Sequence, residues 1–496
     1  METPYIIGIS GMTAHVASVY RIAAQIKDAY PDSIIIGGGI HLTALPEEAL
    51  EKGTFDYVVQ GEGEKALLAL VEVIRGGGDT RLIPGVSFVA DGNIIKNPEG
   101  PLLPDLDDLP MFPHHMFEHS RYDRGFLITS RGCPYKCTYC SQRMMTGSTY
   151  RFRSPAKILE EMDLIINKYG QNRITLYDDN FCVKRSRVKE LCRVIIENRF
   201  NEKCKFSLQT RADNFPEELV PILSEAGFKM VGFGMETASQ RLADLISKDE
   251  TVEQHFEALE LAKKHDMEVM LHMISGLPTE TKEERKLSYQ VLKKANCHAP
   301  KFNNLIPHPG TPMFEDLKHS NRVHKEPDWT NFDSTMSGTG SIFDKTPMAY
   351  VPETVSEFEL KRDIIYYNLR VNLSWQNILN VVFRRGQLSW VELPPKWYFK
   401  PKEIYSLVKV GMVLSSNLVI AFLPLWITEP FMNMLNPAMK ARPRIIDYDQ
   451  TEYKPSGWDE ENVKLKAQLL TIARHDKNNP NSVDGSNTTS LQTRSF

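Results

Sequence analysis

Six strand-like segments, each followed by a helical stretch, constrain the fold of this 496-residue chain more than any other feature. Strands that alternate with helices are typical of parallel βαβ units. Six such units predict an α/β fold with an incomplete, TIM-like (β/α)6 barrel, in which residues that follow the strands meet at one rim. The segments are Phe126–Thr129, Arg173–Tyr177, Lys205–Gln209, Met230–Gly234, Val269–Ile274 and Phe302–Ile306.

The first ninety residues show the same alternation on a smaller scale. Apolar runs at Tyr5–Ser10, Ser33–Ile36 and Phe55–Val59 predict three buried strands, with helices between and after them. Three parallel strands make a small, Rossmann-like sheet that leaves an edge exposed. We therefore expect residues 1–90 to form an incomplete α/β domain.

The amino-acid composition indicates where the further domains of the chain begin and end. Residues 91–118 include a stretch rich in proline and aspartate, which predicts a linker ahead of a barrel at 119–330. Beyond it, helical segments at Val355–Asn372 and Pro401–Ser416 predict a mainly helical region over 331–475. The last residues, 476–496, are rich in Asn, Ser and Thr, which predicts a disordered tail.

Charge and cysteine content limit the function classes. The formal net charge is −4, from 59 basic and 63 acidic side chains, which gives no electrostatic case for nucleic acid as a partner. Seven cysteines are too few and too unevenly spread for a disulfide scaffold, which favours a reducing compartment. The start of the chain lacks the pattern of a signal peptide, so we expect a cytoplasmic location.

One apolar stretch leaves the relation to membranes open. Residues 410–427 carry no charge, and their length is at the lower limit for a spanning helix. Asn417 and Pro424 argue against a span, whereas Lys409 and Trp426 flank the stretch as in interfacial segments. We favour a buried helix; a membrane-interface segment that delivers a lipid-like substrate and a true span are the alternatives.

Three of the cysteines, Cys133, Cys137 and Cys140, lie directly after the first predicted barrel strand. Thiolates are the usual ligands of iron–sulfur clusters. A [4Fe–4S] cube bound by three thiolates keeps one iron open for another ligand. A zinc site normally needs a second Cys/His pair, which no nearby spacing provides. Zinc binding and a purely structural role are therefore the weaker alternatives.

This loop resembles the hallmark of the radical SAM superfamily, a CxxxCxΦC motif in which Tyr139 is the aromatic residue. The resemblance covers roughly residues 120–325. It implies that the three cysteines hold a [4Fe–4S] cluster whose open iron binds S-adenosylmethionine (SAM). In that family, reductive cleavage of SAM yields a 5′-deoxyadenosyl radical that abstracts hydrogen from a substrate. A reductase, flavodoxin or ferredoxin would donate the electron.

The later strand ends extend the resemblance. It implies that Asp179 contacts the SAM amino group, that Gln209 and Arg211 face the methionine carboxylate, and that Glu236 accepts from the ribose hydroxyls. For Asp178 and Asp179 the alternative is a helix N-cap, and for Arg211 it is a surface ion pair.

The ends of the fifth and sixth strands complete the match. Gly276 and Pro278 belong to a segment that lies on the adenine side in relatives, many of which have glycine where Thr279 stands. A Pro309-Gly310-Thr311-Pro312 turn follows the sixth strand, as it does in the family. Cys182, just past the second strand, is expected to be a core residue, as are Cys192 and Cys204.

Residues 1–90 resemble the later part of a cobalamin-binding domain fused in front of radical SAM barrels. The resemblance implies that Ser10 hydrogen-bonds the cobalamin tail and that Gly37 and Gly38 allow its close approach. Relatives carry a cobalt-ligand motif well before this serine. Neither His15 nor His41 stands in that position, so neither is assigned as a ligand. A longer protein and a domain that binds cobalamin weakly, or not at all, both remain open.

These observations favour a radical SAM enzyme that uses cobalamin to methylate an unactivated carbon of a small-molecule or lipid-like substrate. The main alternative is a radical SAM oxidoreductase or cyclase without functional cobalamin. A non-enzymatic iron–sulfur protein that carries electrons or senses oxygen is the third class. The sequence assigns no catalytic side chain beyond the cofactor-binding residues.

Overall fold

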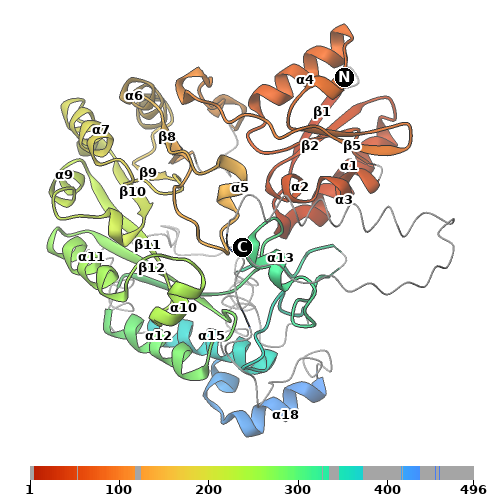
Figure 1. The fold of residues 1–496 in the computed structure, drawn as a ribbon. Coiled ribbons are helices and arrows are strands. Elements are labelled where there is room, and N and C mark those ends of the chain that lie inside the picture. Colours follow the sequence, from red (N-terminus) through yellow and green to blue (C-terminus); the bar gives the residue numbers. More distant parts are fainter. Residues whose placement is uncertain are drawn as a thin grey trace, which may run out of the picture.

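The computed structural model describes residues 5–52, 54–117, 124–295, 297–326, 328–334, 346–372, 415, 417–435, 453 and 457. It shows an α/β protein in which a smaller N-terminal sheet lies beside a larger one (Figure 1). Nearly all of the helix predicted over Pro401–Ser416, and the whole of the tail predicted over 476–496, lie outside the described residues.

The N-terminal unit is built on a five-stranded sheet in the order β1-β2-β3-β4-β5. The three predicted strands are present and parallel: β1 (Ile6–Ser10), β2 (Ile34–Gly38) and β3 (Tyr57–Val59). The sequence analysis did not predict the antiparallel hairpin β4 (Val86–Ala90) and β5 (Asn93–Lys96). Its turn, Asp91-Gly92, has two positive φ angles, which is the conformation that Asp-Gly favours in two-residue hairpins.

Helices cover both faces of this sheet. Ile35 and Val58 pack towards one face, and Ile36 and Val59 pack towards the other. The first of these cores also contains Trp329 from beyond the second sheet, so the two units share buried apolar contacts. The helices are α1 (Val16–Ala29), α2 (Ile40–Ala44), α3 (Pro46–Glu51) and α4 (Glu64–Gly76).

The second sheet has six parallel strands in chain order, β6-β9-β10-β11-β12-β13. All six predicted strands are therefore confirmed, and the last begins three residues earlier than predicted. Their bounds are β6 (Phe126–Leu127), β9 (Arg173–Leu176), β10 (Lys205–Thr210), β11 (Phe228–Glu236), β12 (Glu268–Ser275) and β13 (Ala299–Asn304). A short separate pair, β7 (Ser130–Arg131) and β8 (Arg151–Phe152), follows β6.

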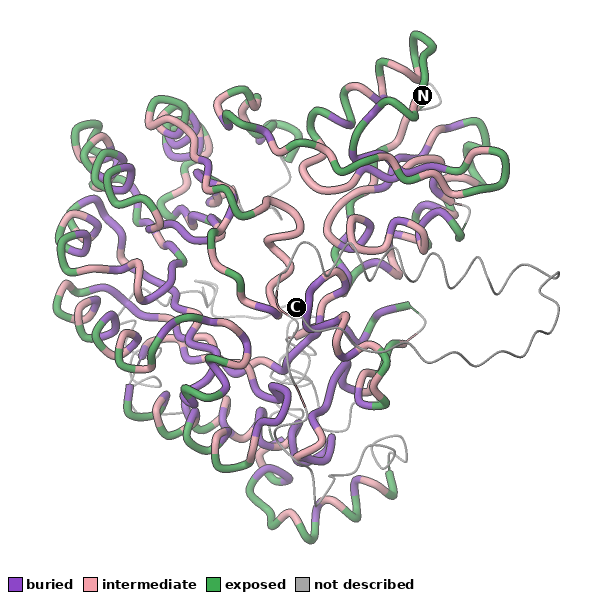
Figure 2. The backbone as a smooth tube through the Cα atoms, viewed as in Figure 1, coloured by how far each residue is buried: buried purple, intermediate pink, exposed green. Residues whose placement is uncertain are grey.

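One face of the six-stranded sheet packs on helices. Leu208, Phe233 and Leu271 lie in the same core as residues of the surrounding helices. Figure 2 shows that the strands of this sheet are largely buried. Because side chains alternate along a strand, the intervening residues point to the opposite side, called the inner face below. The helices are α5 (Gln142–Thr146), α6 (Pro155–Asp163), α7 (Arg185–Glu197), α8 (Phe200–Lys203), α9 (Val220–Glu225), α10 (Gln240–Leu245), α11 (Val252–Lys264), α12 (Lys282–Ala295) and α13 (Pro312–Leu317).

The helix α15 (Glu357–Asn372) closes the β13 edge of this sheet. The Asn368 side chain accepts a hydrogen bond from the Phe302 backbone N–H and donates one to its carbonyl, both at 2.9 Å. The Asn368 side chain thus satisfies backbone groups at the β13 edge that could otherwise pair with another strand.

The helix α18 (Leu425–Leu435) packs on α15 through Phe358, Ile365 and Met432. The favoured interpretation of residues 410–427 as a buried helix holds for only part of the described stretch. Ile420 and Ala421 are buried, whereas Phe422 is exposed and Trp426 is 78% exposed. Among the described helices, none is long and apolar enough to cross a membrane.

We predict that Asn368→Ala lowers the free energy of unfolding by about 1–3 kcal/mol, because it leaves a buried strand N–H and C=O unpaired. Asn372→Ala is the matched control, since that side chain makes only a 3.3 Å bond to the Pro300 carbonyl and one within its own helix. Urea unfolding of both variants measures the difference. Equal urea midpoints for the two variants would contradict the proposed role of Asn368 at the β13 edge.

Candidate cluster and cofactor site

The cysteine loop is framed by the β7–β8 pair, which brings residues 131 and 151 opposite each other. Gly132 opens the loop with φ +89°, and a Cβ there would overlap the Thr149 carbonyl. Cys133 N–H donates to the Gly147 carbonyl at 3.3 Å. Only glycine suits this first position, because it combines a left-handed conformation with a close backbone approach.

Two aspartates that follow β9 hold the same loop. Asp178 is buried and accepts from the Thr129 N–H at 2.6 Å, the Thr129 hydroxyl at 2.5 Å and the Ser130 N–H at 3.0 Å. Asp179 accepts from the Gly132 N–H at 2.9 Å and the Thr146 hydroxyl at 2.8 Å. The next helix, α7, begins after Lys184, so the N-cap alternative for both aspartates is wrong.

In the described part of the chain the three cysteines form no disulfide, and their side chains are partly buried and close enough to influence one another electrostatically. Burial raises the pKa of each, that of Cys140 to about 12. Among the described residues, no group of three or more His, Cys, Asp or Glu side chains is arranged to hold a single metal ion. A cube makes no such demand, because each thiolate binds a different iron, so the set fits a cluster with one open iron.

Three of the remaining cysteines are confirmed as core residues. Cys182, Cys192 and Cys204 are buried among the apolar residues between the sheet and its helices. Cys297 is buried in the same core.

Arg211 lies at the end of β10, packed against the cysteine loop. Its guanidinium lies 3.5 Å from the centre of the Tyr135 ring and donates to Asp213 at 2.9 Å. It also donates to the carbonyls of Lys248 and Asp249, at 2.6 and 3.1 Å. Arg211 is buried, so the surface ion-pair alternative is wrong.

Lys248 is a buried cation that the sequence analysis missed. Its ammonium lies 3.1 Å from Glu250 and 3.8 Å from Glu236. Its charge also lowers the pKa of Cys137, against the larger effect of burial. No local pattern marks this lysine, because its role depends on residues from three other parts of the chain.

Glu236 ends β11 in a strained conformation. Its φ is +64°, and the pairing with β12 shifts register between Gly234 and Glu236. The carboxylate accepts from the Tyr139 hydroxyl at 3.0 Å, and a Cβ on Gly234 would clash with it. Backbone strain of this kind, in an acidic residue held against a loop, is typical of functional positions.

The remaining residues predicted to bind SAM occupy neighbouring strand ends. Gln209 lies on the inner face of β10, and its side chain covers Gly232. Gly276 follows β12 with φ +87°, and Pro278 is buried two residues on. Thr279 adopts φ +62°, which explains in physical terms why glycine suits that position. Arg241 holds it through a 2.9 Å bond to the hydroxyl.

The inner face also carries polar groups that the sequence analysis did not single out. His272 on β12 pairs with Lys301 on β13, and Asn303 lies two residues further. His272 Nε2 and Asn303 Oδ1 have no hydrogen-bond partner among the described residues. Burial and the Lys301 charge lower the pKa of His272 to about 4. The sequence could have indicated these residues, because they are polar residues at alternate positions of otherwise apolar strands.

The residues predicted to bind cobalamin lie at the carboxyl edge of the N-terminal sheet. Ser10 is exposed and pairs with Gly38. A Cβ on Gly37 would lie 2.5 Å from Leu42, so this glycine serves internal packing, whereas Gly38 faces more open space. An exposed hydroxyl beside a glycine at this edge fits a ligand site of an open α/β sheet. His41 is buried and His15 is exposed.

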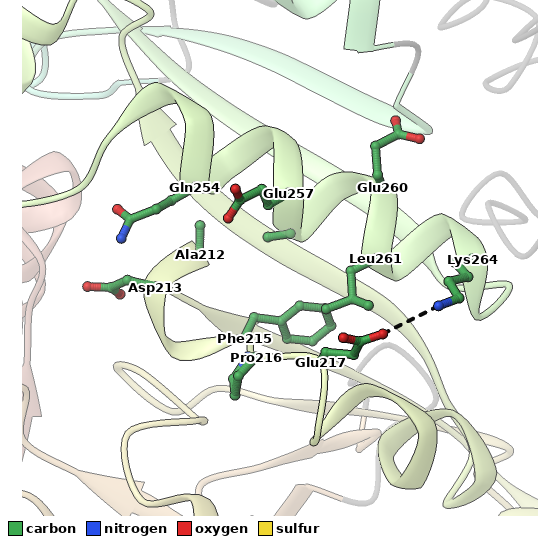
Figure 3. Close-up of a pocket in the computed structure, with 11 residues that line it drawn as sticks. Ala212, Asp213, Phe215, Pro216, Glu217, Gln254, Glu257, Glu260, Leu261 and Lys264 are labelled. Carbon is green, nitrogen blue, oxygen red and sulfur yellow. Dashed lines mark hydrogen bonds and ion pairs between the residues drawn. The ribbon is translucent and has the colours of Figure 1, made fainter.

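Among the described residues, two pockets near this region differ in their relation to the predicted site. One, of about 510 Å³, lies between η6 (Ala212–Asn214) and α11 and contains none of the residues predicted to bind a cofactor (Figure 3). The other, of about 260 Å³, lies where linker residues cover β6, and Arg131 lines it. The second pocket therefore adjoins the cysteine loop.

Comparisons with known proteins identify two domains in the chain. The family described as "Radical SAM superfamily" matches residues 127–292, and "B12 binding domain" matches residues 2–71. An uncharacterized methyltransferase from Pyrococcus horikoshii is 29% identical, over 63% of this chain and 69% of its own. An anaerobic magnesium-protoporphyrin IX monomethyl ester cyclase from Rubrivivax gelatinosus is 27% identical, over 63% of this chain and 58% of its own.

Two solved structures share the fold. The radical SAM methyltransferase TsrM from Kitasatospora setae, with cobalamin and a [4Fe–4S] cluster bound, has a TM-score of 0.58 and 21% identity over 73% of this chain and 74% of its own. The cobalamin-dependent SAM radical enzyme OxsB, with aqua-cobalamin and SAM bound, has a TM-score of 0.61 and 16% identity over 98% and 74%.

The fold, the cysteine loop and the family match define a radical SAM enzyme. More particularly, this chain is a radical SAM enzyme with an N-terminal B12-binding domain, and its relatives are named as methyltransferases and cyclases. The two domains imply a [4Fe–4S] cluster, SAM and cobalamin as cofactors.

We predict that Cys140→Ala abolishes cluster assembly, because one of three irons bound by protein loses its ligand. Iron and sulfide content after anaerobic reconstitution measures the loss. Cys182→Ala is the matched control and is expected to keep its iron, since that thiol is buried in the core. Full iron content in the Cys140 variant would show that the ligand assignment is wrong.

Proposed function

We propose that this chain is a cobalamin-dependent methyltransferase that acts on an unactivated carbon of a small molecule. One observation carries the proposal: a three-cysteine loop packs against polar residues of successive strand ends and lies beside a B12-binding domain. When bound, the cluster supplies the electron that cleaves SAM, and cobalamin carries a methyl group. A cyclase reaction is the alternative, because one group of relatives bears that name.

The side chains around the loop suggest a division of tasks. Arg211 already donates to Asp213 and to two carbonyls, so most of its hydrogens are used. We assign it to hold Tyr135 and the Lys248 segment in place. The Lys248 ammonium, which lies between two carboxylates, is a second cation beside the proposed SAM site.

Asp179 and Glu236 complete the proposed SAM site. Asp179 fixes the loop through the Gly132 N–H and keeps a carboxylate beside the cysteines. Glu236 is held by Tyr139, the aromatic residue of the cysteine motif, and would accept the ribose hydroxyls. Gly276 and Pro278 would form the adenine side, and Gly276 lets the backbone turn there with φ +87° while Leu360 packs closely against it.

The inner face supports a substrate with at least one polar group. His272 and Asn303 each bury an atom that lacks a partner, and leaving such atoms unpaired costs about 1–3 kcal/mol each. A substrate that hydrogen-bonds them would remove this penalty. The neighbouring Lys301 favours an anionic group there.

A peripheral membrane contact, or a lipid-like substrate, rests on a different observation. In α18 the polar residues Thr428 and Glu429 turn towards the protein, and Glu429 bonds the Ser356 hydroxyl at 2.5 Å. Trp426, Phe431 and Met434 face outward. An apolar outer surface of this kind is typical of segments that meet other apolar surfaces.

We predict that Glu236→Gln weakens SAM binding by about 10- to 100-fold, because a charged acceptor for hydroxyl groups is lost. Equilibrium binding of SAM to the reconstituted protein measures the effect. Glu225→Gln, on the surface at the end of α9, is the control and is expected to bind SAM normally. Unchanged affinity in the Glu236 variant would remove this residue from the SAM site.

We expect the reduced wild-type protein to release 5′-deoxyadenosine from SAM without added substrate and to retain cobalamin on purification. Chromatography of the products and the absorption spectrum of the protein measure the two properties separately. Cleavage without cobalamin would favour the oxidoreductase or cyclase alternative. An absence of cleavage would reject both radical SAM assignments.

A further inference from the structure

An ion-pair cluster joins the B12-binding domain to the cysteine loop. Glu62 follows β3, and its carboxylate is only 4% exposed. It accepts two hydrogen bonds from Arg151, at 2.6 and 2.8 Å, and one from the Leu103 N–H at 2.8 Å. Two parallel hydrogen bonds fix the orientation of the Arg151 guanidinium relative to the Glu62 carboxylate as well as the distance between them. A single hydrogen bond would fix only the distance.

Arg151 is fully engaged in this cluster. Besides Glu62, its guanidinium donates to the carbonyls of Leu103, Thr146 and Thr149, at 2.7, 2.6 and 3.3 Å. All five of its N–H donors therefore have an acceptor. Thr146 and Thr149 belong to the second half of the cysteine loop, so Arg151 links that half directly to Glu62.

Arg131 links the first half of the cysteine loop to the same segment of the B12-binding domain. It immediately precedes Gly132 and lies opposite Arg151 in the β7–β8 pair. Two cations in this arrangement repel each other unless carboxylates neutralise them. Glu64 accepts from Arg131 at 2.7 Å, and Glu62 lies 3.5 Å from it. The Glu62–Glu64 segment thus neutralises both ends of the loop that carries the three cysteines.

The position of Glu62 connects this ion-pair cluster to the proposed cobalamin site. β1, β2 and β3 are parallel, so Ser10, Gly38 and the segment after β3 lie at the same carboxyl edge of the sheet. A second contact reinforces the junction, since a Cβ on Gly310 would meet both Met144 of the cysteine loop and Ala44 of α2. The edge proposed to bind cobalamin is therefore fixed to the loop proposed to bind the cluster.

We propose that Glu62 and Arg151 act as a positioning pair that sets the distance between the cobalamin site and the iron–sulfur site. The inference rests on the proposed function, because it assigns both cofactors to this chain. Removing the pair is expected to leave each cofactor bound while the distance between them becomes variable. SAM cleavage would continue, and its coupling to methyl transfer would fall.

The test measures the distance directly. Cob(II)alamin and the reduced cluster are both paramagnetic, so a nearby cluster speeds the electron-spin relaxation of cob(II)alamin. A lone Glu62→Ala change would leave a buried, unpaired arginine and is strongly destabilising. The double variant Glu62→Leu/Arg151→Met replaces both charges by apolar groups and keeps the volume filled. Glu47→Leu/Lys96→Met, which removes an exposed ion pair of the same domain, is the matched control.

We expect pulsed electron paramagnetic resonance to show fast cob(II)alamin relaxation in the wild type and the control, and slow or widely distributed relaxation in the Glu62/Arg151 variant with iron and cobalamin contents unchanged. Wild-type relaxation in that variant would overturn the positioning role. So would loss of the cluster itself, which would make the pair a support of the cysteine loop alone. Absence of bound cobalamin in the wild type would instead contradict the proposed function.

A second variant protects the test against misfolding. Arg151→Lys keeps the positive charge but cannot form the two-pronged contact with Glu62. We expect its relaxation to lie between those of the wild type and the double variant. Relaxation in Arg151→Lys equal to that of the wild type would show that charge alone, and not orientation, holds the two sites together, and would overturn the proposal.

Discussion

The hydrogen bonds that Asp178 and Asp179 make to the backbone at both ends of β7 hold the start of the cysteine loop in place. Asp178 anchors Thr129 and Ser130 before the loop, and Asp179 anchors Gly132 at its start. Both aspartates come from the end of β9, which the parallel sheet places beside β6. The site depends on this arrangement, because three thiols can share a cluster only if the loop keeps one shape.

Charge compensation is the second constraint. The region around the loop buries Arg211, Lys248, Glu236 and Glu250 together, and each cation lies within 4 Å of a carboxylate. Buried charges are tolerated when they are paired and hydrogen-bonded, and they are costly otherwise. The same principle operates at the junction with the B12-binding domain, where Glu62 and Glu64 neutralise Arg131 and Arg151. The protein thus uses ion pairs both to shape the site and to attach its two domains.

Local sequence signals were sufficient for the strands and the cysteine loop. Apolar runs, turn residues and the spacing of Cys133, Cys137 and Cys140 are all features of short segments. Other features required the fold. Glu62 pairs with Arg151, which is distant in sequence, and Lys248 pairs with Glu236 as well as with the nearby Glu250, so the sequence alone did not indicate the role of either residue. Gly37 was expected to face a ligand, but it makes room for Leu42, because only the packed structure shows which side of a glycine is filled. The hairpin β4–β5 was missed although its Asp91-Gly92 turn was visible.

The central claim is that Cys133, Cys137 and Cys140 hold a cluster whose open iron binds SAM. Electron-nuclear double resonance of the reduced protein with SAM labelled by ¹⁵N at the amino group and ¹⁷O at the carboxylate tests it most directly. We expect hyperfine coupling of both labels to the cluster, because both labelled atoms would then lie on iron. A cluster signal without coupling to either label would contradict it.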